Sequence, residues 1–249
     1  MSTNRTILIV RQRTTFVLKK YYRFGGSIPV CIDDHSSTSL MQTSRTTPSR
    51  LAKRAHYDAA TIHPILDEAL FCTISYVMDG QPMAIPTAFA RKDNKLYIHG
   101  SVGSHFIRTL EHGAPVCISV MLADGLVLAK SAFSHSVNYR SVVIFANAEK
   151  VTDEAERMEA LALITDHLIP SRWDDLRPTT DSEMRKTTVL AFSVAEASAK
   201  VRTGGPNDDP EDKDLPTWAG VIPLQTMRLA PISATYNAAI ELPDYLQKL

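Results

Sequence analysis

The sequence predicts an α+β protein, mainly β, in which seven strands form a closed or partly open antiparallel barrel with helices packed outside. Three observations predict this class. Alternating apolar and polar residues mark many strands but few helices. Tight turn dipeptides, such as Asp79-Gly80, Asp93-Asn94 and Asp124-Gly125, bound several of the strands. No alternation of strands with crossover helices occurs. Because tight hairpins require antiparallel pairing, a doubly wound parallel sheet is disfavoured.

The predicted strands are joined mostly by short loops. They cover residues 70–78, 83–91, 95–99, 115–122, 126–133, 139–151 and 187–201. A chain of 249 residues with 44% hydrophobic content is long enough to bury a substantial core around them.

Three helices accompany the strands. An early one has Pro64 in its first turn and one apolar face, made of Ile62, Ile65, Leu66 and Ala69. A second covers residues 105–112, with Ser104 as its N-cap and Gly113 at its end. The clearest one begins at a capping box of Asp153 and Glu156 and ends before Pro170.

One turn carries the clearest functional signal. Residues 96–99 alternate as a strand, and the chain then passes through Gly100, Ser101 and Gly103 into the helix that Ser104 caps. The glycines permit close backbone approach. A helix start offers free N–H groups and the positive end of the helix dipole, and serine hydroxyls add donors. The turn therefore predicts a phosphate site, with an ordinary serine-capped connection as the alternative.

Composition excludes several classes of protein. Basic and acidic residues balance at 27 each, although residues 1–50 carry a net charge of +6 and the remainder −6. The mildly acidic body argues against a nucleic-acid partner, and no apolar run approaches the ~20 residues of a membrane span. Cys31, Cys72 and Cys117 lack disulfide or zinc spacing, which favours a reducing compartment; we expect a cytoplasmic location.

The chain divides into three parts. Residues 1–48 are basic and rich in Ser and Thr, which is typical of a disordered tail or an organellar targeting segment. Residues 49–229 hold the barrel, with a turn-rich acidic loop over 202–216 and an apolar run over 218–224. Residues 230–249 form a weakly patterned C-terminal tail.

Six short motifs occur in order between about residues 50 and 229. They are Arg54-x-x-Tyr57-Asp58, Gly80-x-Pro82-x-x-x-Pro86, Leu96-Tyr97-Ile98-His99-Gly100-Ser101, His135-Ser136-x-Asn138-Tyr139-Arg140-Ser141-Val142, Lys200-x-Arg202-x-Gly204-x-Pro206 and Trp218-Ala219-Gly220-Val221-Ile222-Pro223-Leu224. Together they resemble the flavin-nucleotide-binding branch of the pyridoxamine 5'-phosphate oxidase-like superfamily, which includes nitroimidazole-resistance proteins.

The resemblance implies a split β-barrel of Greek-key topology, a homodimer, and FMN in a cleft between the two subunits. It places Ile85, Pro86 and Thr87 beside the isoalloxazine ring. It places Gly100, Ser101, Ser104 and Arg108 beside the phosphate. Near the flavin it also places Tyr139, Arg140, Ser141 and Trp218. His99 is the candidate catalytic group, as a proton donor or a polar contact to flavin or substrate.

Each of these side chains also has a purely structural interpretation. His99 could be a hydrogen-bonded turn histidine, Arg140 could form a surface ion pair, and Trp218 could pack in the core. The residues alone leave these alternatives open.

The expected function is transfer of electrons from a nicotinamide donor to a small acceptor, with FMN carrying the redox chemistry. The arginine-and-histidine pattern that the oxidases use for pyridoxal is missing after Trp218, so vitamin B6 oxidation is not expected. Two other classes stay open: a non-catalytic flavin- or haem-binding protein, with iron held by His99, His105 or His135, and an interaction module without a cofactor. The eight histidines lack metal-ligand spacing, so no separate metal site is expected.

Overall fold

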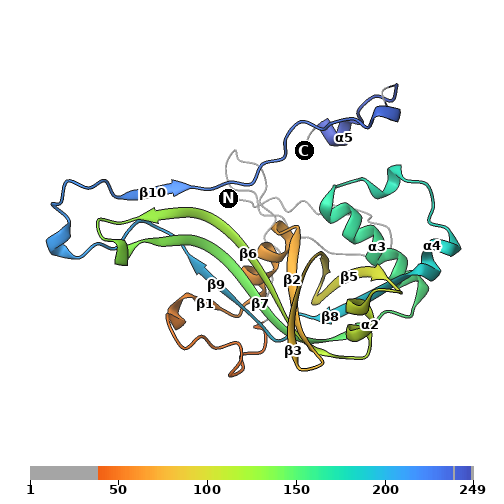
Figure 1. Cartoon of the computed structure of the whole chain (residues 1–249), viewed down its shortest axis with the longest axis horizontal. Coiled ribbons are helices and arrows are strands. Elements are labelled where there is room, and N and C mark those ends of the chain that lie inside the picture. The colour runs from red at the N-terminus through yellow and green to blue at the C-terminus, as the bar shows by residue number, and fades with distance from the viewer. Residues whose placement is uncertain (1–38, 238, 248–249) are drawn as a thin grey trace, which may run out of the picture. The chain divides into compact units, whose positions relative to one another are not determined.

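One open, ten-stranded antiparallel sheet dominates the computed structural model, which describes residues 39–237 and 239–247 (Figure 1). The main path of strands is β3-β2-β6-β7-β8-β5-β4; β10 also pairs with β6, and β9 pairs with β7 and β1. Only Phe89 separates β3 from β4 along the chain, so the two ends of this path meet in sequence and the sheet curls into a split barrel. The predicted fold class is confirmed.

The elements follow one another closely along the chain. The strands are β1 (Ala55–His56), β2 (Phe71–Met78), β3 (Gln81–Ala88), β4 (Ala90–Lys92), β5 (Lys95–Ser101), β6 (Pro115–Leu128), β7 (Ser136–Lys150), β8 (Thr187–Ser193), β9 (Ala197–Arg202) and β10 (Gly220–Pro223). The α-helices are α1 (Ala59–Glu68), α2 (His105–Glu111), α3 (Glu154–Leu168), α4 (Asp181–Lys186) and α5 (Asp244–Gln247). The 3₁₀ helices are η1 (Ala52–Arg54), η2 (Ala132–Ser134), η3 (Trp173–Asp175), η4 (Pro210–Asp212) and η5 (Thr235–Asn237).

The core forms where alternate residues of the strands turn to the inside of the barrel. Ile74 of β2, Ile98 of β5 and Phe192 of β8 are fully buried there, and α1 and α2 add Leu66 and Ile107 to the same cluster. On the outer face of β5 and β8, helix α3 covers a second cluster, which comprises Ala90, Tyr97, Val151, Ala160, Ile164, Val189 and Ala191. Burial on both faces explains why residues 96–98 form a continuous apolar run.

Asp124-Gly125 lies inside a strand, so the turn predicted at this dipeptide is wrong. β6 continues through it, with a register shift opposite β7. A Cβ on Gly125 would lie 3.0 Å from Cγ1 of Val221 and 3.1 Å from the carbonyl oxygen of Ile222. This glycine therefore allows β10 to approach β6 closely.

Other strand boundaries also differ from the prediction. The predicted strand 187–201 is interrupted at residues 194–196 and forms β8 and β9, and the strand 83–91 divides at the buried Phe89. The predicted strand 126–133 ends with β6, and η2 follows it. The turns at Asp79-Gly80 and Asp93-Asn94 are confirmed, and the leading aspartate of each has a positive φ.

Side-chain caps define where the main helices begin. Ser104 and Asp153 accept hydrogen bonds from first-turn N–H groups of α2 and α3, as predicted, and Asp58 does the same for α1. Because Asp58 begins α1 early, Pro64 lies inside the helix and not in its first turn. The sequence-based prediction lacks α4, which begins at a complete capping box of Thr180 and Glu183.

Residues 39–48 pack against the barrel, although the sequence groups them with the N-terminal extension. Leu40 is buried in the core and its N–H donates to the carbonyl oxygen of Tyr57 at 2.7 Å. The N–H of Met41 donates to the carbonyl oxygen of Ala195, also at 2.7 Å. The rest of the predicted extension, with Cys31, lies outside the described residues. Among the helices described, none is long and apolar enough to span a bilayer.

Candidate functional site

The turn between β5 and α2 is held by its own serines. The N–H of Ser104 donates to the carbonyl oxygen of Ser101 at 2.9 Å, and the N–H of Gly103 donates to the Ser101 hydroxyl oxygen at 3.2 Å. The Ser104 hydroxyl oxygen accepts a weak bond, at 3.5 Å, from the N–H of Ile107. The first two N–H groups of α2 make no hydrogen bond to any described residue. They remain available to an anion at the positive end of the helix.

Gly100 serves a different purpose from the one that the sequence suggests. A Cβ at this position would lie 2.6 Å from Cγ1 of Ile107, so the glycine makes room for α2 against the strand. Gly103 faces open space, where the nearest atom to its virtual Cβ is the Ser101 hydroxyl oxygen at 3.7 Å. Close approach of a ligand to the backbone is therefore possible at Gly103.

Cationic residues border this turn from two helices. Arg108 lies exposed one turn into α2. The carbonyl oxygen of Lys186, the last residue of α4, accepts the N–H of Val102 at 3.1 Å, and Ser101 pairs with the next residue, Thr187. The proximity of Lys186 was not predicted, because the only sequence signal for α4 is its capping box.

His99 lies on the outer face of β5, opposite Val189 of β8. The residue is exposed by surface area, yet the protein atoms around the imidazole exclude enough water to lower its pKa below the ordinary 6.5. At neutral pH the ring is therefore uncharged, with one donor and one acceptor nitrogen. This state suits a hydrogen-bond contact to a ligand better than proton donation.

The predicted flavin strand, β3, divides its side chains between two faces. Ile85 and Thr87 are partly buried opposite buried residues of β2, whereas Pro86 is exposed on the outer face. β3 pairs only with β2, but extension of the β4–β5 register into β3 would set Pro86 opposite Ser101. Within the described chain, no ladder hydrogen bonds therefore join β3 to the end of β5, and this gap in the ladder is the split of the barrel.

Arg140 is fully engaged by two carboxylates. Its Nε and Nη2 donate to Asp124 at 3.0 and 2.7 Å, and Nη2 also donates to Glu68 at 2.8 Å, with Nη1 bound to the same carboxylate. The hydrogen bonds with Glu68 raise the pKa of Arg140 and lower that of Glu68. The ion-pair interpretation therefore describes Arg140 in the single chain, and its donors are not free for an anion.

Tyr139, Ser141 and Trp218 lie away from the β5–α2 turn. Tyr139 and Ser141 alternate with Arg140 on β7, and the Ser141 hydroxyl donates to the carbonyl oxygen of Lys200 at 3.3 Å. Trp218 is 63% exposed, with its ring over Gly220, so it does not pack in the core.

β10 lies beside one end of the long β6–β7 hairpin, whereas α2 lies at the other end (Figure 1). β10, which follows Trp218, pairs with β6 from Gly125 onward, whereas the loop after α2 meets β7 beside Pro115, where Asn147 donates to the carbonyl oxygen of Gly113 at 2.7 Å. At ~3.3 Å per residue, the two ends of β6, Pro115 and Leu128, are roughly 40 Å apart along the strand. One chain therefore cannot bring both features to one ligand.

The fold and the turn define a class: an antiparallel split barrel with an anion-ready strand-to-helix connection at its split. The family model of pyridoxamine 5'-phosphate oxidase matches residues 58–201, more than half of the chain. The chain belongs to this family. Among proteins with curated functions, none matches the sequence.

Solved structures of relatives support the same assignment. The flavocytochrome Anf3 from Azotobacter vinelandii is 40% identical, with a TM-score of 0.78 over 83% of this chain and 96% of its own. An FAD- and haem-binding protein from Mycobacterium smegmatis is 37% identical, with a TM-score of 0.75 over 78% and 96%. A protein named for 5-nitroimidazole antibiotic resistance, from Bacteroides thetaiotaomicron, is 25% identical, with a TM-score of 0.50 over 59% and 86%.

Proposed function

We propose that the protein is a flavin-binding redox protein that passes electrons from a nicotinamide donor to a small acceptor, with FMN as the expected flavin. The observation that carries this proposal is the β5–α2 turn at the split of the barrel. Its two free amides and the hydroxyls of Ser101 and Ser104 could bind an anion. The flavin named for the Mycobacterium relative and the flavocytochrome description of the Azotobacter relative support it.

The residues of the turn would hold the phosphate, and a bound flavin would supply the electron transfer. The two free amides and the Ser104 hydroxyl would donate to phosphate oxygens, with Arg108 and Lys186 adding positive charge nearby. His99 would contact the ligand as a neutral hydrogen-bond partner. Micromolar affinity requires about −8 kcal/mol; three charge-assisted contacts of roughly 1.5–3 kcal/mol each, with a buried ring, are sufficient.

A homodimer would complete this site. Trp218 and the β5–α2 turn lie at opposite ends of the β6–β7 hairpin, so only a second subunit could bring an exposed Trp218 to the flavin. A twofold axis would then create two equal sites. We also propose a cytoplasmic location, in agreement with the free thiols of Cys72 and Cys117.

The test is to identify what copurifies with the protein. We expect yellow protein that releases FMN or FAD, distinguished by mass spectrometry, and whose absorbance near 450 nm is bleached by NADH or NADPH without oxygen. Colourless protein that also gives no heat with FMN or FAD in calorimetry would contradict the proposal. Bound flavin that neither NADH nor NADPH bleaches would contradict a nicotinamide donor and support flavin binding alone.

Haem is the second candidate, because both of the most similar relatives described above carry a haem or cytochrome name. His135 is a suitable ligand: its Nδ1 lies 2.8 Å from the carbonyl oxygen of Ser131, which leaves Nε2 free, as in metal-bound histidines. His112 offers a matched control, since its Nδ1 lies 2.5 Å from the carbonyl oxygen of Arg108. We expect H135A, but not H112A, to remove the Soret band of the wild-type protein. The same spectrum in the wild type and both variants would exclude His135 as the haem ligand.

A further inference from the structure

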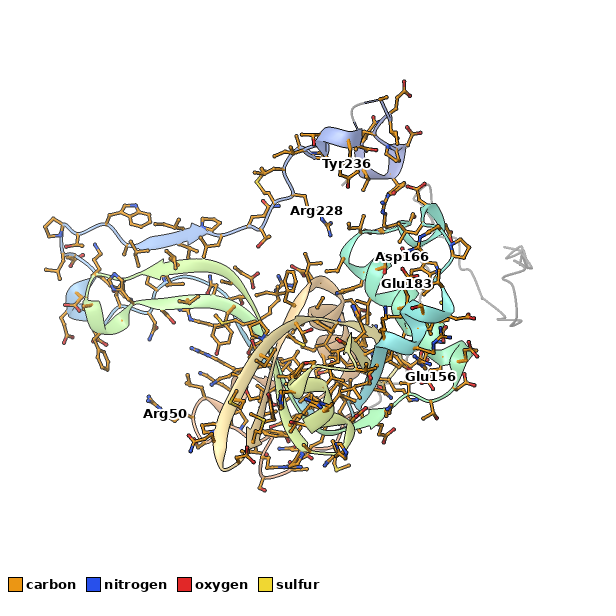
Figure 2. All side chains as sticks on the ribbon, turned by 45° about the vertical axis from the view of Figure 1, so that its right-hand side comes forward. Arg50, Glu156, Asp166, Glu183, Arg228 and Tyr236 are labelled. Carbon is orange, nitrogen blue, oxygen red and sulfur yellow. The ribbon has the colours of Figure 1, made fainter. Side chains whose placement is uncertain are left out.

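The segment between β10 and η5, with η5 itself, crosses the molecule as an anchored strap. We define the C-terminal strap as residues 224–237. At its start the N–H of Leu224 donates to the carbonyl oxygen of Asp124 at 3.0 Å, and in its middle Arg228 Nη2 donates to the carbonyl oxygen of Leu168, at the end of α3, at 2.8 Å. Figure 2 shows the Arg228 side chain directed from the strap toward α3. Beyond the strap, the Tyr245 hydroxyl lies 2.7 Å from Arg172 Nη1.

The strap makes few hydrogen bonds with the rest of its own chain. No backbone group of residues 225–233 forms a hydrogen bond within the described part of the molecule. Leu229, Ile232 and Tyr236 are 83%, 97% and 93% exposed, and Met227 is also largely exposed. Four large apolar side chains at such exposure within ten residues indicate an interaction surface, because soluble chains rarely leave so much apolar surface in water.

The same chain carries a surface that could receive these side chains. Phe71 and Val77 alternate on the outer face of β2, and Met121 lies on the same face of the neighbouring β6. Each is more than half exposed. Small residues, including Ser75 and Ser119, lie between them, so the face is open to a partner.

We propose that the C-terminal strap docks on a second copy of this chain, against the outer face of β2 and β6 that bears Phe71, Val77 and Met121. This inference deepens the proposed homodimer but does not depend on flavin. In a twofold dimer each subunit gives one strap and receives one, so both exposed surfaces are covered at once. Four side chains of this size bury roughly 500 Å² of surface on each strap, and each receiving face loses a similar area. The two contacts of the dimer together therefore bury roughly 2,000 Å² of accessible surface, which is the size that a stable dimer needs.

The first test is the dimer dissociation constant, measured by sedimentation with and without flavin. A double variant, Leu229→Asp with Ile232→Asp, puts four carboxylates into the two strap contacts, and we expect the constant to rise at least 100-fold. Leu176→Asp changes a leucine that is 41% exposed on the loop before α4, outside the strap, and should leave the constant unchanged. Circular dichroism checks that each variant folds.

The second test locates the contact. Photoreactive p-benzoylphenylalanine in place of Tyr236 should give a covalent dimer whose cross-linked peptides map to β2 or β6. The same substitution at Tyr245, which Arg172 and Asp175 hold within the chain, should give no covalent dimer. A monomeric wild-type protein, an unchanged constant for the double variant, or cross-links to other proteins alone would overturn the inference. Colourless protein that still dimerises through the strap would contradict only the flavin proposal.

Discussion

Ser104 is the residue on which the phosphate proposal is tested most directly. Aspartate is also a good N-cap, so Ser104→Asp keeps the start of α2 while placing a negative charge where the phosphate would bind. We therefore expect loss of flavin retention without loss of thermal stability. Fluorescence of flavin released after gel filtration measures this loss. The control is Ser193→Asp, at the exposed end of β8; wild-type flavin occupancy in Ser104→Asp would remove the turn from the site.

His99 gives a prediction about pH. Desolvation lowers its pKa in the folded chain, so the unfolded chain binds the proton more readily. Stability should therefore fall as pH decreases through and below the unfolded value of about 6.5. The half-buried His63 acts in the same direction, mainly because it is also desolvated.

Two measurements check the behaviour of His99. An NMR titration should place the midpoint of its imidazole below 6.5, and His99→Gln should flatten the loss of thermal stability between pH 7 and 5. The carboxylates with lowered pKa values, such as Glu68, lose their contribution only below about pH 4.5, so the two effects occupy different ranges. A midpoint above 6.5 would show that the ring is charged more readily than its burial implies.

At the scale of secondary-structure elements, the close contact of β5 with α2 requires a residue without a side chain at Gly100. A Cβ there would overlap Ile107, whose side chain is buried in the core, so the helix would have to move. We expect Gly100→Ala to reduce the free energy of unfolding by about 1–3 kcal/mol, as overpacking does. A Cβ added by Gly103→Ala, three residues further on, meets nothing nearer than the Ser101 hydroxyl oxygen at 3.7 Å, an ordinary contact, and should cost much less. Urea unfolding of both variants makes the comparison; equal losses would contradict it.

The strands were largely predictable because alternation records which face of each strand is buried. The strand preceding His99 and the Ser104 cap were both found in this way. The turn predicted at Asp124-Gly125 was wrong, because the sequence does not distinguish a glycine in a tight turn from a glycine that allows a neighbouring strand to approach closely. α4 is too short to show helical periodicity, so only its capping box could have identified it.

The candidate site was less predictable than the fold. The turn between β5 and α2 is local, so its serines and its helix start are visible in the sequence. The engagement of Arg140 is not, because Glu68 and Asp124 are distant in sequence and reach it only after α1 has packed beside the sheet. The separation of Trp218 from the turn likewise follows from the length of β6 and the pairing of β10, not from a motif.

At the scale of the molecule, Arg140 joins three parts of the fold. It lies on β7 opposite Leu122 of β6, just before the register shift of that strand. It binds both Asp124, within the shift, and Glu68, at the end of α1. The hairpin carries β10, from which the C-terminal strap continues. The direction of the hairpin therefore depends on a charged network at its base.

Removal of this arginine should destabilise the fold. Arg140→Met keeps an unbranched apolar stem but removes the guanidinium, which leaves the half-buried Asp124 and the exposed Glu68 without their partner. We expect a loss of about 1–2 kcal/mol, because solvent screens much of each pair. Since Arg140 lowers the pKa of Glu68, the contribution of this pair is present above about pH 4.5 and disappears as pH falls through the folded value. The stabilities of wild type and Arg140→Met should therefore converge in acid. Adding Glu68→Gln to the variant should recover part of the loss at pH 7, and no recovery would show that Arg140 acts through packing and not through charge.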